Sequence, residues 1–388
     1  MKILFVGDAV IKNVDGFSLD DKLVALIKNH DFCLVNFEGG LEGPRDFQIQ
    51  KIGPHVFNAA DAARTLKAAG FNVFALANNH ILDYGADSFN KTLALLDSLS
   101  VKRLGAGKTF LEAYEPLLLD AGDEKIAIVN ACHAEFGVYK DKYVPLQGGY
   151  AWINNPIVDD TVLKLKAKGY LVVVVAHAGV EFMELPLPEW RERYRRFVDL
   201  GADLVIGGHP HIVQGKELYN GKPIYYSLGN FFFPNLQKSQ DFEWNHGLAV
   251  SYDTKTGACQ EFFLEQGVAG VSFCSNPALK QKFDKRSQIL CDDVQYYKMI
   301  NQIVCDLWAN TYKPLYDAVP NFINCRNHFA KNLLKYFAKK FIFRSRYQKD
   351  LNETLLLHNI QIESHRYVAE RFLYLQNCKV NNLLYQEP

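Results

Sequence analysis

Short apolar runs alternate with amphipathic stretches along the chain up to about residue 268. The runs are rich in Val, Ile and Phe, and several are apolar throughout, as expected of strands that are covered on both faces. The strand-like runs span residues 2–6, 32–37, 72–77, 125–131, 170–176, 203–207, 223–227 and 246–252, and helical patterns span 61–69, 89–99 and 187–200. Strand and helix in repetition predict an α/β domain with a largely parallel sheet.

The pattern changes after about residue 268. No glycine occurs from Val271 to the C-terminus, and apolar residues recur at helical spacing through 294–308, 327–341 and 351–375. We therefore expect an α/β domain over residues 1–268 and a helical region over residues 269–388. Residues 326–349 are basic, with aromatic or leucine side chains four residues apart. This amphipathic helix would pack its apolar face into a core or lie on an anionic membrane surface, and both interpretations stay open.

Composition narrows the class of protein. Hydrophobic residues make up 48% and charged residues 22% of the 388 residues, which is ordinary for a globular protein. The 43 basic and 43 acidic residues give no net charge, so we expect no nucleic-acid partner. The longest apolar stretch, 171–176, is far shorter than the roughly 18 residues of a membrane span. The N-terminus lacks signal-peptide features, so we expect a cytoplasmic protein, with the basic helix as a candidate contact with the inner membrane face.

The eight cysteines are scattered along the chain, with no C-x-x-C spacing. This pattern argues against a zinc ribbon and against a thioredoxin-type redox motif. Without an export signal, a disulfide framework is not expected either.

Side chains with metal-ligating chemistry follow five of the predicted strands. Because ligands bind at the carboxyl ends of strands in open α/β sheets, we expect these side chains to meet in one cavity. Two histidines two residues apart on an extended backbone point to one side, so His209 and His211 would face that cavity together. Carboxylate and imidazole donors without thiolate favour Mn, Fe or Zn, which can activate water. The side chains are Asp8, Glu38, Asn79, His80, His177, His209 and His211.

Each motif also has a structural interpretation. Asp8 follows Gly7 in what is commonly a turn, Glu38 suits a solvated loop, and His177 suits a hydrogen-bonded residue at the rim of the core. Asn78 and Asn79 are typical of a helix N-cap. The run G-G-H-P-H at 207–211 is hard to explain structurally, and the joint occurrence of all five motifs favours a metal centre.

These ordered motifs resemble the poly-γ-glutamate capsule synthesis (CapA-like) family, which is itself similar to the calcineurin-like metallophosphoesterases. The motifs are G-D at 7–8, N-F-E-G at 36–39, N-N-H-x-x-D-Y-G at 78–85, H-x-G-x-E-F at 177–182, the run 201–233 and H-G at 246–247. The resemblance extends from residue 2 to about 252 and does not include the helical tail. It implies a four-layer α/β/β/α sandwich of metallophosphoesterase type, with a metal centre at the strand ends.

The resemblance also implies roles for individual residues. Glu38 would be the metal-bridging acid, and His80 would be the general acid, oriented by Asp83. The implied metal ligands are Asp8, Glu38, Asn79, His177, His209 and His211, of which Asp8 and His211 belong to a second metal position. The residues near the motifs that would contact substrate are Lys51, Glu181, Asn230 and His246, and His133 is a further pocket candidate.

Two departures from the expected motifs bear on function. The first motif of the superfamily is Asp-x-His, but here Val10 stands at the histidine position, so a second ion would have fewer protein ligands. The family shows His-Trp-Gly where this chain has Ala178 in the middle, which would reshape the pocket and change its substrate.

Three functions remain open on these grounds. The leading one is a metal-dependent hydrolase with one or two ions, cleaving a phosphoester or amide-type bond in an anionic polymer or phosphoester substrate of capsule or cell-surface polymer synthesis. The alternative is a non-catalytic accessory protein of polysaccharide or poly-γ-glutamate synthesis with a vestigial metal site. The missing histidine favours the alternative, whereas the His80 and Asp83 pair argues against it. The third is a membrane-surface scaffold that uses the basic helix.

Overall fold

The computed structural model describes residues 1–388 apart from 122–123, 144–146, 236–240, 314–357, 360 and 381–388. The chain forms two compact units. The first comprises residues 1–49 and 55–300, and the second comprises residues 50–54 and 301–388. All the predicted site residues except Lys51 belong to the first unit.

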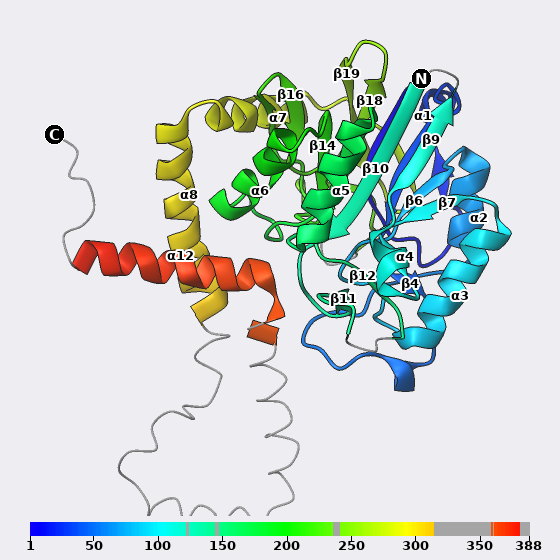
Figure 1. The fold of residues 1–388 in the computed structure, drawn as a ribbon, viewed down its shortest axis with the longest axis horizontal. Helices are drawn as coiled ribbons and strands as arrows, with labels where there is room; N and C mark the ends of the chain where they lie inside the picture. Colours follow the sequence, from blue (N-terminus) through cyan, green and yellow to red (C-terminus); the bar gives the residue numbers. More distant parts are fainter. Residues whose placement is uncertain (122–123, 144–146, 236–240, 314–357, 360, 381–388) are drawn as a thin grey trace, which may run out of the picture. The chain divides into compact units, whose positions relative to one another are not determined.

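Two β-sheets form the framework of the first unit (Figure 1). The order of the nine-stranded sheet is β2 (Ser18–Leu19), β20 (Gly270–Phe273), β19 (Cys259–Gln266), β18 (His246–Asp253), β1 (Lys2–Ala9), β3 (Phe32–Phe37), β6 (Val73–Ala75) and β7 (Lys102–Leu104), with β17 (Asn230–Phe232) also paired with β1. From β1 to β7 the strands are parallel, and from β1 to β20 they are antiparallel.

The second sheet has six strands. Their order is β15 (Lys216–Tyr219), β16 (Lys222–Tyr225), β14 (Leu204–Gly208), β13 (Leu171–His177), β10 (Glu124–Cys132) and β9 (Leu117–Ala121). The four strands from β16 to β10 are parallel, and an antiparallel strand closes each edge. The largely parallel character predicted from the sequence therefore holds for the centre of the six-stranded sheet and for the half of the nine-stranded sheet from β1 to β7.

Alternate residues of β1 belong to two different cores. Ile3 and Phe5 lie in the core between the two sheets, whereas Leu4 and Val6 pack with the helices α1 (Asp21–Lys28), α2 (Ala60–Ala69) and α3 (Gly85–Ser98). This alternation follows from the two-residue period of a strand. Helices α5 (Pro156–Ala167) and α6 (Pro188–Asp199) pack against the six-stranded sheet (Figure 1). The four-layer α/β/β/α sandwich expected from the sequence is confirmed.

Smaller elements surround the sandwich. Two short sheets are formed by β11 (Val138–Tyr139), β12 (Gly149–Ala151) and β8 (Ala106–Gly107), and by β4 (Gly40–Leu41) and β5 (Phe57–Asn58). The short helices are the 3-10 helix η1 (Arg45–Phe47) and α4 (Phe110–Tyr114).

The described part of the C-terminal region is helical after β20. It contains α7 (Pro277–Leu290), α8 (Asp293–Leu307), the π-helical turn η3 (Trp308–Tyr312) and α12 (Glu363–Val380). The nine-stranded sheet extends past the expected boundary at residue 268, because β20 pairs with β19. The basic segment 326–349 lies outside the described residues, so its two interpretations stay predictions. Among the described residues, no helix has the length and apolar character of a membrane span.

Candidate metal centre

The predicted strand-end side chains come from both sheets and converge between them. Asp8 lies near the end of β1, and Glu38 directly follows β3 in the nine-stranded sheet. In the facing sheet, His177 ends β13 and His209 directly follows β14. Asn79 lies in the turn after β6, and each of these five residues is at most 4% exposed. Inside the sandwich, the acidic side chains of the nine-stranded sheet therefore face the histidines of the six-stranded sheet.

Asp8, Glu38 and His211 form a first group, in which the candidate ligand atoms lie within 4.8 Å of one another. The His211 Nδ1 atom is 3.2 Å from Asp8 Oδ2, and its Nε2 atom is 3.7 Å from Glu38 Oε1. Asn230 Oδ1 lies 3.0 Å from the same Nδ1 atom and accepts its proton. Because Nδ1 is engaged in this way, the ring presents Nε2 toward Glu38, the geometry of an oriented metal-ligating histidine.

The electrostatics of this first group reflect buried charge. Burial alone would lower the pKa of His211, but Glu38 and Asp8 raise it to about 10. Burial raises the pKa of Glu38 well above its usual range. Neither carboxylate oxygen of Glu38 has a hydrogen-bond partner among the described residues. Because a buried carboxylate without a donor is costly, a cation fits this position.

His133, Glu135 and His209 form a second group, again with ligand atoms within 4.8 Å of one another. His133 and Glu135 follow β10, and the His133 Nε2–H group donates to Glu135 Oε1 at 2.8 Å. The rings of His133 and His209 are 4.3 Å apart in an edge-to-face arrangement. His209 Nδ1 is buried and has no hydrogen-bond partner within the described part of the chain. Burial lowers the pKa of His209 well below its usual value, which favours the neutral ring that metals bind.

His177 links the two groups. Its Nδ1 atom accepts a hydrogen bond from Asn36 Nδ2 at 3.1 Å and lies 3.6 Å from Asp8 Oδ1. Its Nε2–H group points to Asn79 Oδ1 at 3.2 Å, and Asn79 Nδ2 in turn donates to Glu135 Oε2 at 3.0 Å. Burial lowers the pKa of His177 to about 3, so this ring is neutral as well. The two groups are therefore parts of one continuous polar centre.

The predicted pair of His80 and Asp83 lies beside the first group. The His80 Nδ1–H group donates to Asp83 Oδ2 at 2.7 Å, and the same oxygen accepts the backbone N–H of Val56 at 2.8 Å. Asp83 is fully buried, so its position is fixed by these contacts. The opposite ring nitrogen, Nε2, lies 3.8 Å from Glu38 Oε1. This is the arrangement that a general acid oriented by a carboxylate requires.

His209 and His211 converge by a route that differs from the predicted one. We expected an extended backbone to aim both rings the same way, but β14 ends at Gly208 and both histidines have positive φ, 93° and 59°. Because of this left-handed turn, the His209 side chain lies in the second group and the His211 side chain lies in the first group. Glycine is required just before it, because a Cβ atom at Gly207 would lie 2.0 Å from the carbonyl oxygen of Tyr226.

The residues predicted to contact substrate lie in different places. Asn230 reaches the centre through its bond to His211, and Glu181 is exposed after β13. His246 bonds the carbonyl oxygen of Phe242 and lies in a separate group with Glu265 and Cys274. Lys51 belongs to the segment 50–54 of the second unit. The substrate roles of Lys51, Glu181, Asn230 and His246 stay predictions.

Aromatic side chains line one side of His211. The Trp244 ring lies 5.2 Å from it, and the half-exposed Phe182 stacks on Trp244 at 5.7 Å. An indole therefore stands beside the centre, although the sequence has Ala178 where the family motif predicts tryptophan.

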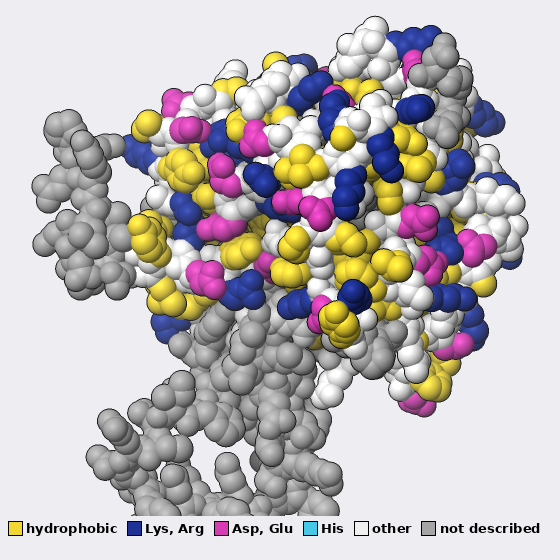
Figure 2. All heavy atoms as spheres, in the orientation of Figure 1, with side chains coloured by type: hydrophobic (Ala, Val, Ile, Leu, Met, Phe, Trp, Pro, Cys, Tyr) yellow, Lys and Arg dark blue, Asp and Glu magenta, His cyan; other side chains and the backbone are white. Residues whose placement is uncertain are grey.

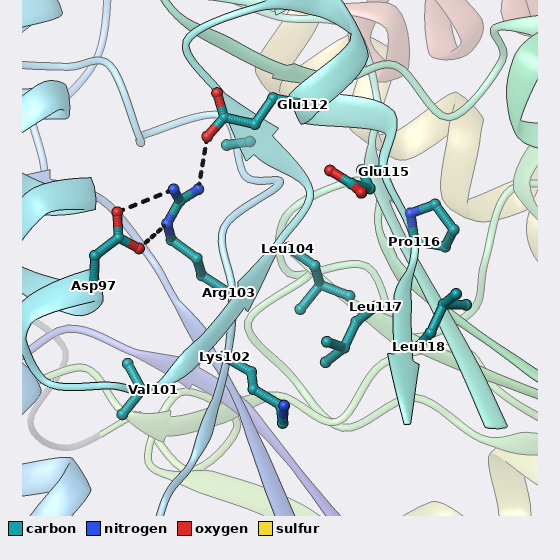
Figure 3. Close-up of a pocket in the computed structure, with 11 residues that line it drawn as sticks. Asp97, Val101, Lys102, Arg103, Leu104, Glu112, Glu115, Pro116, Leu117 and Leu118 are labelled. Carbon is teal, nitrogen blue, oxygen red and sulfur yellow. Dashed lines mark hydrogen bonds and ion pairs between the residues drawn. The ribbon is translucent and has the colours of Figure 1, made fainter. Parts of the chain in front are cut away.

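A cavity of about 500 Å³ is separate from the centre and lies between the edge strands β7 and β9 (Figure 3). Its side chains include Arg103, which donates to Asp97 and Glu112. None of the described residues that line it is a predicted site residue. Figure 2 shows basic and acidic side chains interspersed on the face in view, as the balanced net charge leads one to expect.

Two residues of the centre were not predicted, Asn36 and Glu135. Asn36 stands in the N-F-E-G motif, but within a predicted strand. Glu135 belongs to no recognised motif, and its signal is the His-x-Glu spacing with His133 directly after the strand 125–131.

Comparison with known proteins identifies relatives over the part of the chain that forms this centre. Residues 2–235 match the family model described as "Bacterial capsule synthesis protein PGA_cap". The capsule biosynthesis protein CapA of Bacillus anthracis is 32% identical over 214 residues, which cover 53% of this chain and 51% of that protein. A probable polyglutamine synthesis accessory protein of Mycobacterium tuberculosis is 31% identical over 210 residues, covering 52% and 55%. The chain thus matches only about half the length of these curated relatives.

Among solved structures, a NAD nucleotidase from Haemophilus influenzae aligns with a TM-score of 0.37 and 15% identity, covering 73% of this chain and 61% of that one. The family model matches more than half of the chain, and the matched range includes every residue of the two groups. The chain belongs to the bacterial capsule synthesis protein family PGA_cap.

Proposed function

We propose that this protein is a metal-dependent hydrolase that cleaves a phosphoester or amide-type bond in the synthesis of capsule or another cell-surface polymer. The proposal rests on one observation. Side chains that could ligate a metal are buried between two facing sheets, and some of their ligand atoms have no hydrogen-bond partner among the described residues. Among the described residues, both oxygens of Glu38 and Nδ1 of His209 lack a hydrogen-bond partner. Membership of the capsule synthesis family supports the biological setting.

The donor set suits a divalent transition ion. The carboxylates of Asp8 and Glu38 would offset its charge, and the neutral imidazoles of His177 and His209 would offer lone pairs. Neither group includes a thiolate, which favours Mn, Fe or Zn over Cu(I). A divalent ion bound there supplies a Lewis acid that polarises a phosphoryl or carbonyl oxygen and acidifies water.

His80 is suited to deliver a proton to the leaving group. Asp83 accepts the Nδ1 proton, so the transferable proton would be carried on Nε2, on the side of the ring that faces Glu38. His80 is 5% exposed, and this shielding strengthens electrostatic interactions with a bound substrate. The proposed substrate is an anionic polymer. The cleaved bond would be an amide-type bond if the residues of this polymer are joined by γ-glutamyl linkages.

The test combines elemental analysis with hydrolysis by the full chain. We expect the purified protein, reloaded with Mn, Fe or Zn, to retain an ion and to hydrolyse bis-p-nitrophenyl phosphate or a γ-glutamyl anilide. His80→Ala should lose about 100-fold or more in kcat while keeping the ion, because it removes the proton donor. His30→Gln serves as the control, since His30 bonds Leu26 and Ser251 instead. Absence of bound metal after reloading contradicts the proposal.

A non-catalytic accessory role is the second candidate. Val10 is buried in an apolar cluster where the first motif of the metallophosphoesterase superfamily predicts a histidine ligand, and one relative is named as an accessory protein. This candidate predicts that ions bind but that neither bond class is cleaved.

A further inference from the structure

We propose that His133 and Glu135 are metal ligands that hold an ion together with His209, at a position supplied by the end of β10. The inference rests on the metal centre of the proposed function. It goes beyond that function because it assigns two ligands outside the motifs that carry the family resemblance.

The end of β1 offers no donor at the expected position. Val10 is fully buried and packs with Val56, Phe233 and Trp244. Its backbone N–H donates to the carbonyl oxygen of Phe232, so this part of the strand is committed to sheet pairing. The position of Asp8, Glu38 and His211 therefore has one ligand fewer, and an ion at His209 needs its own set of ligands.

The second group has the chemistry and spacing of such a set. His133, Glu135 and His209 are 0%, 7% and 3% exposed, and their ligand atoms lie within 4.8 Å of one another. Donors at about 2.1 Å from a tetrahedral ion are roughly 3.4 Å apart, so small side-chain shifts would suffice. The unpartnered, buried Nδ1 atom of His209 marks the position that the ion would fill among the described residues.

Backbone pairing places these side chains beside the rest of the centre. In the parallel pair of β10 and β13, Cys132 is opposite His177, and the His133 N–H group donates to the His177 carbonyl oxygen at 3.1 Å. Buried Tyr150 ties the same loop at two points, accepting from the Glu135 N–H at 2.9 Å and donating to the His133 carbonyl at 3.2 Å. A loop held in this way presents its side chains in a fixed geometry.

Metal binding at His133 Nε2 requires a change of tautomer. In the metal-free centre, the His133 Nε2–H group donates to Glu135. When an ion takes the Nε2 lone pair and the carboxylate, the single proton of the neutral ring is carried on Nδ1, so no proton is released.

A positioning role is the competing explanation for Glu135, since its Oε2 atom accepts from Asn79 Nδ2. The variant Glu135→Gln distinguishes the ligand role of Glu135 from the positioning role. Glutamine keeps the volume and an acceptor for Asn79, and its N–H group can donate to His133 Nε2 once that ring carries its proton on Nδ1, but it removes the charged carboxylate. A ligand role predicts loss of an ion in this variant, and a positioning role predicts its retention.

The experiment titrates chelator-treated, full-length protein with Zn²⁺ and measures bound zinc by equilibrium dialysis and elemental analysis. We expect about two ions per chain in the wild type, and one fewer, or at least about 10-fold weaker binding, in Glu135→Gln and His133→Ala. Glu112→Gln is the matched control, because Glu112 lines the separate cavity and should leave zinc binding unchanged. Melting temperatures of the metal-free proteins check the fold.

Undiminished zinc binding by Glu135→Gln overturns the inference and leaves the hydrolase proposal standing. A wild type that binds no zinc overturns both. Because Glu135→Gln conserves volume and hydrogen bonding, its result decides the inference even where His133→Ala lowers the yield of folded protein.

Discussion

A single carboxylate, Asp83, determines which nitrogen of His80 faces the centre. Asp83 Oδ2 is held by the His80 ring and by the Val56 amide, and it is fully buried. A ring fixed in this tautomer has its proton-transfer atom already aimed, so little reorganisation is needed during reaction.

We predict that Asp83→Asn lowers kcat about 10- to 100-fold while metal content stays at the wild-type level. Asparagine retains an acceptor for the Val56 amide, but its neutral side chain stabilises the protonated imidazole less well. Steady-state kinetics with the substrate found by screening measures the effect, and Asp87→Asn on the exposed face of α3 is the control. An unchanged kcat would show that Asp83 only supports the fold.

At the residue scale, the sequence motifs predicted both the donors of the first group and that they belong together. Asp8, Glu38 and His211 stand in recognisable motifs at strand ends, and the structure brings them together. The grouping of His209 with His133 and Glu135 was not predicted, because it depends on the pairing of β10 with β13, which the sequence does not reveal. Glu135 went unnoticed because a carboxylate two residues after a histidine is common on any surface, and only the fold buries it.

At the scale of elements, strands covered on both faces were the most predictable. The runs that predicted β3 and β13 agree with the observed bounds within one residue, because double burial makes nearly every position apolar. β19 was missed, since most of its residues are only half-buried and polar residues interrupt the run. α5 was also missed, although its Asn155 cap followed by Pro156 was a readable start signal.

The contact of α6 with β15 depends on a buried ion-pair network. Glu217 on β15 pairs with Arg191 and Arg195 of α6 and accepts the hydroxyl proton of Tyr226. Burial alone would raise the pKa of Glu217, but the hydrogen bonds from Arg195 and Tyr226 lower it below 4.5. Arg191 also bonds Asp293 at the start of α8, so the network extends to the helices that follow the sheet.

We predict that Glu217→Gln lowers the free energy of unfolding near pH 7 by about 3 kcal/mol, because it removes the buried carboxylate that Arg191 and Arg195 share. A folded-state pKa below the unfolded value gives stability that is present above about pH 4.5 and is lost as pH falls through the folded pKa. The difference between wild type and variant should therefore shrink in acid. Denaturant melts at pH 7 and pH 3.5 measure it, with Glu192→Gln at the exposed end of the network as the control. A difference that is independent of pH would contradict this account.

At the scale of the whole first unit, the candidate ligands connect the two sheets of the sandwich. Asp8 and Glu38 belong to the nine-stranded sheet, whereas His177, His209 and His211 belong to the six-stranded one. The apolar core between the sheets is continuous away from the strand ends, but the strand ends themselves meet through polar and charged groups. Without an ion, this end of the interface contains the Glu38 carboxyl group, whose oxygens have no hydrogen-bond partner among the described residues. An ion at the centre would act as a cross-link between the sheets.

Metal removal should therefore destabilise the sandwich as a unit. At a free ion concentration 100 times the dissociation constant, binding to the folded state alone adds about 2.7 kcal/mol, which corresponds to roughly 4–5 °C in the melting temperature of a domain of this size. We expect Zn²⁺ or Mn²⁺ to raise the melting temperature of chelator-treated protein by this amount, and EDTA to reverse it. Asp8→Asn should reduce the gain, because it removes a ligand that connects β1 to His211 across the sheets. If elemental analysis shows bound ion but the melting temperature does not change, the ion binds the unfolded chain equally well and does not cross-link the two sheets.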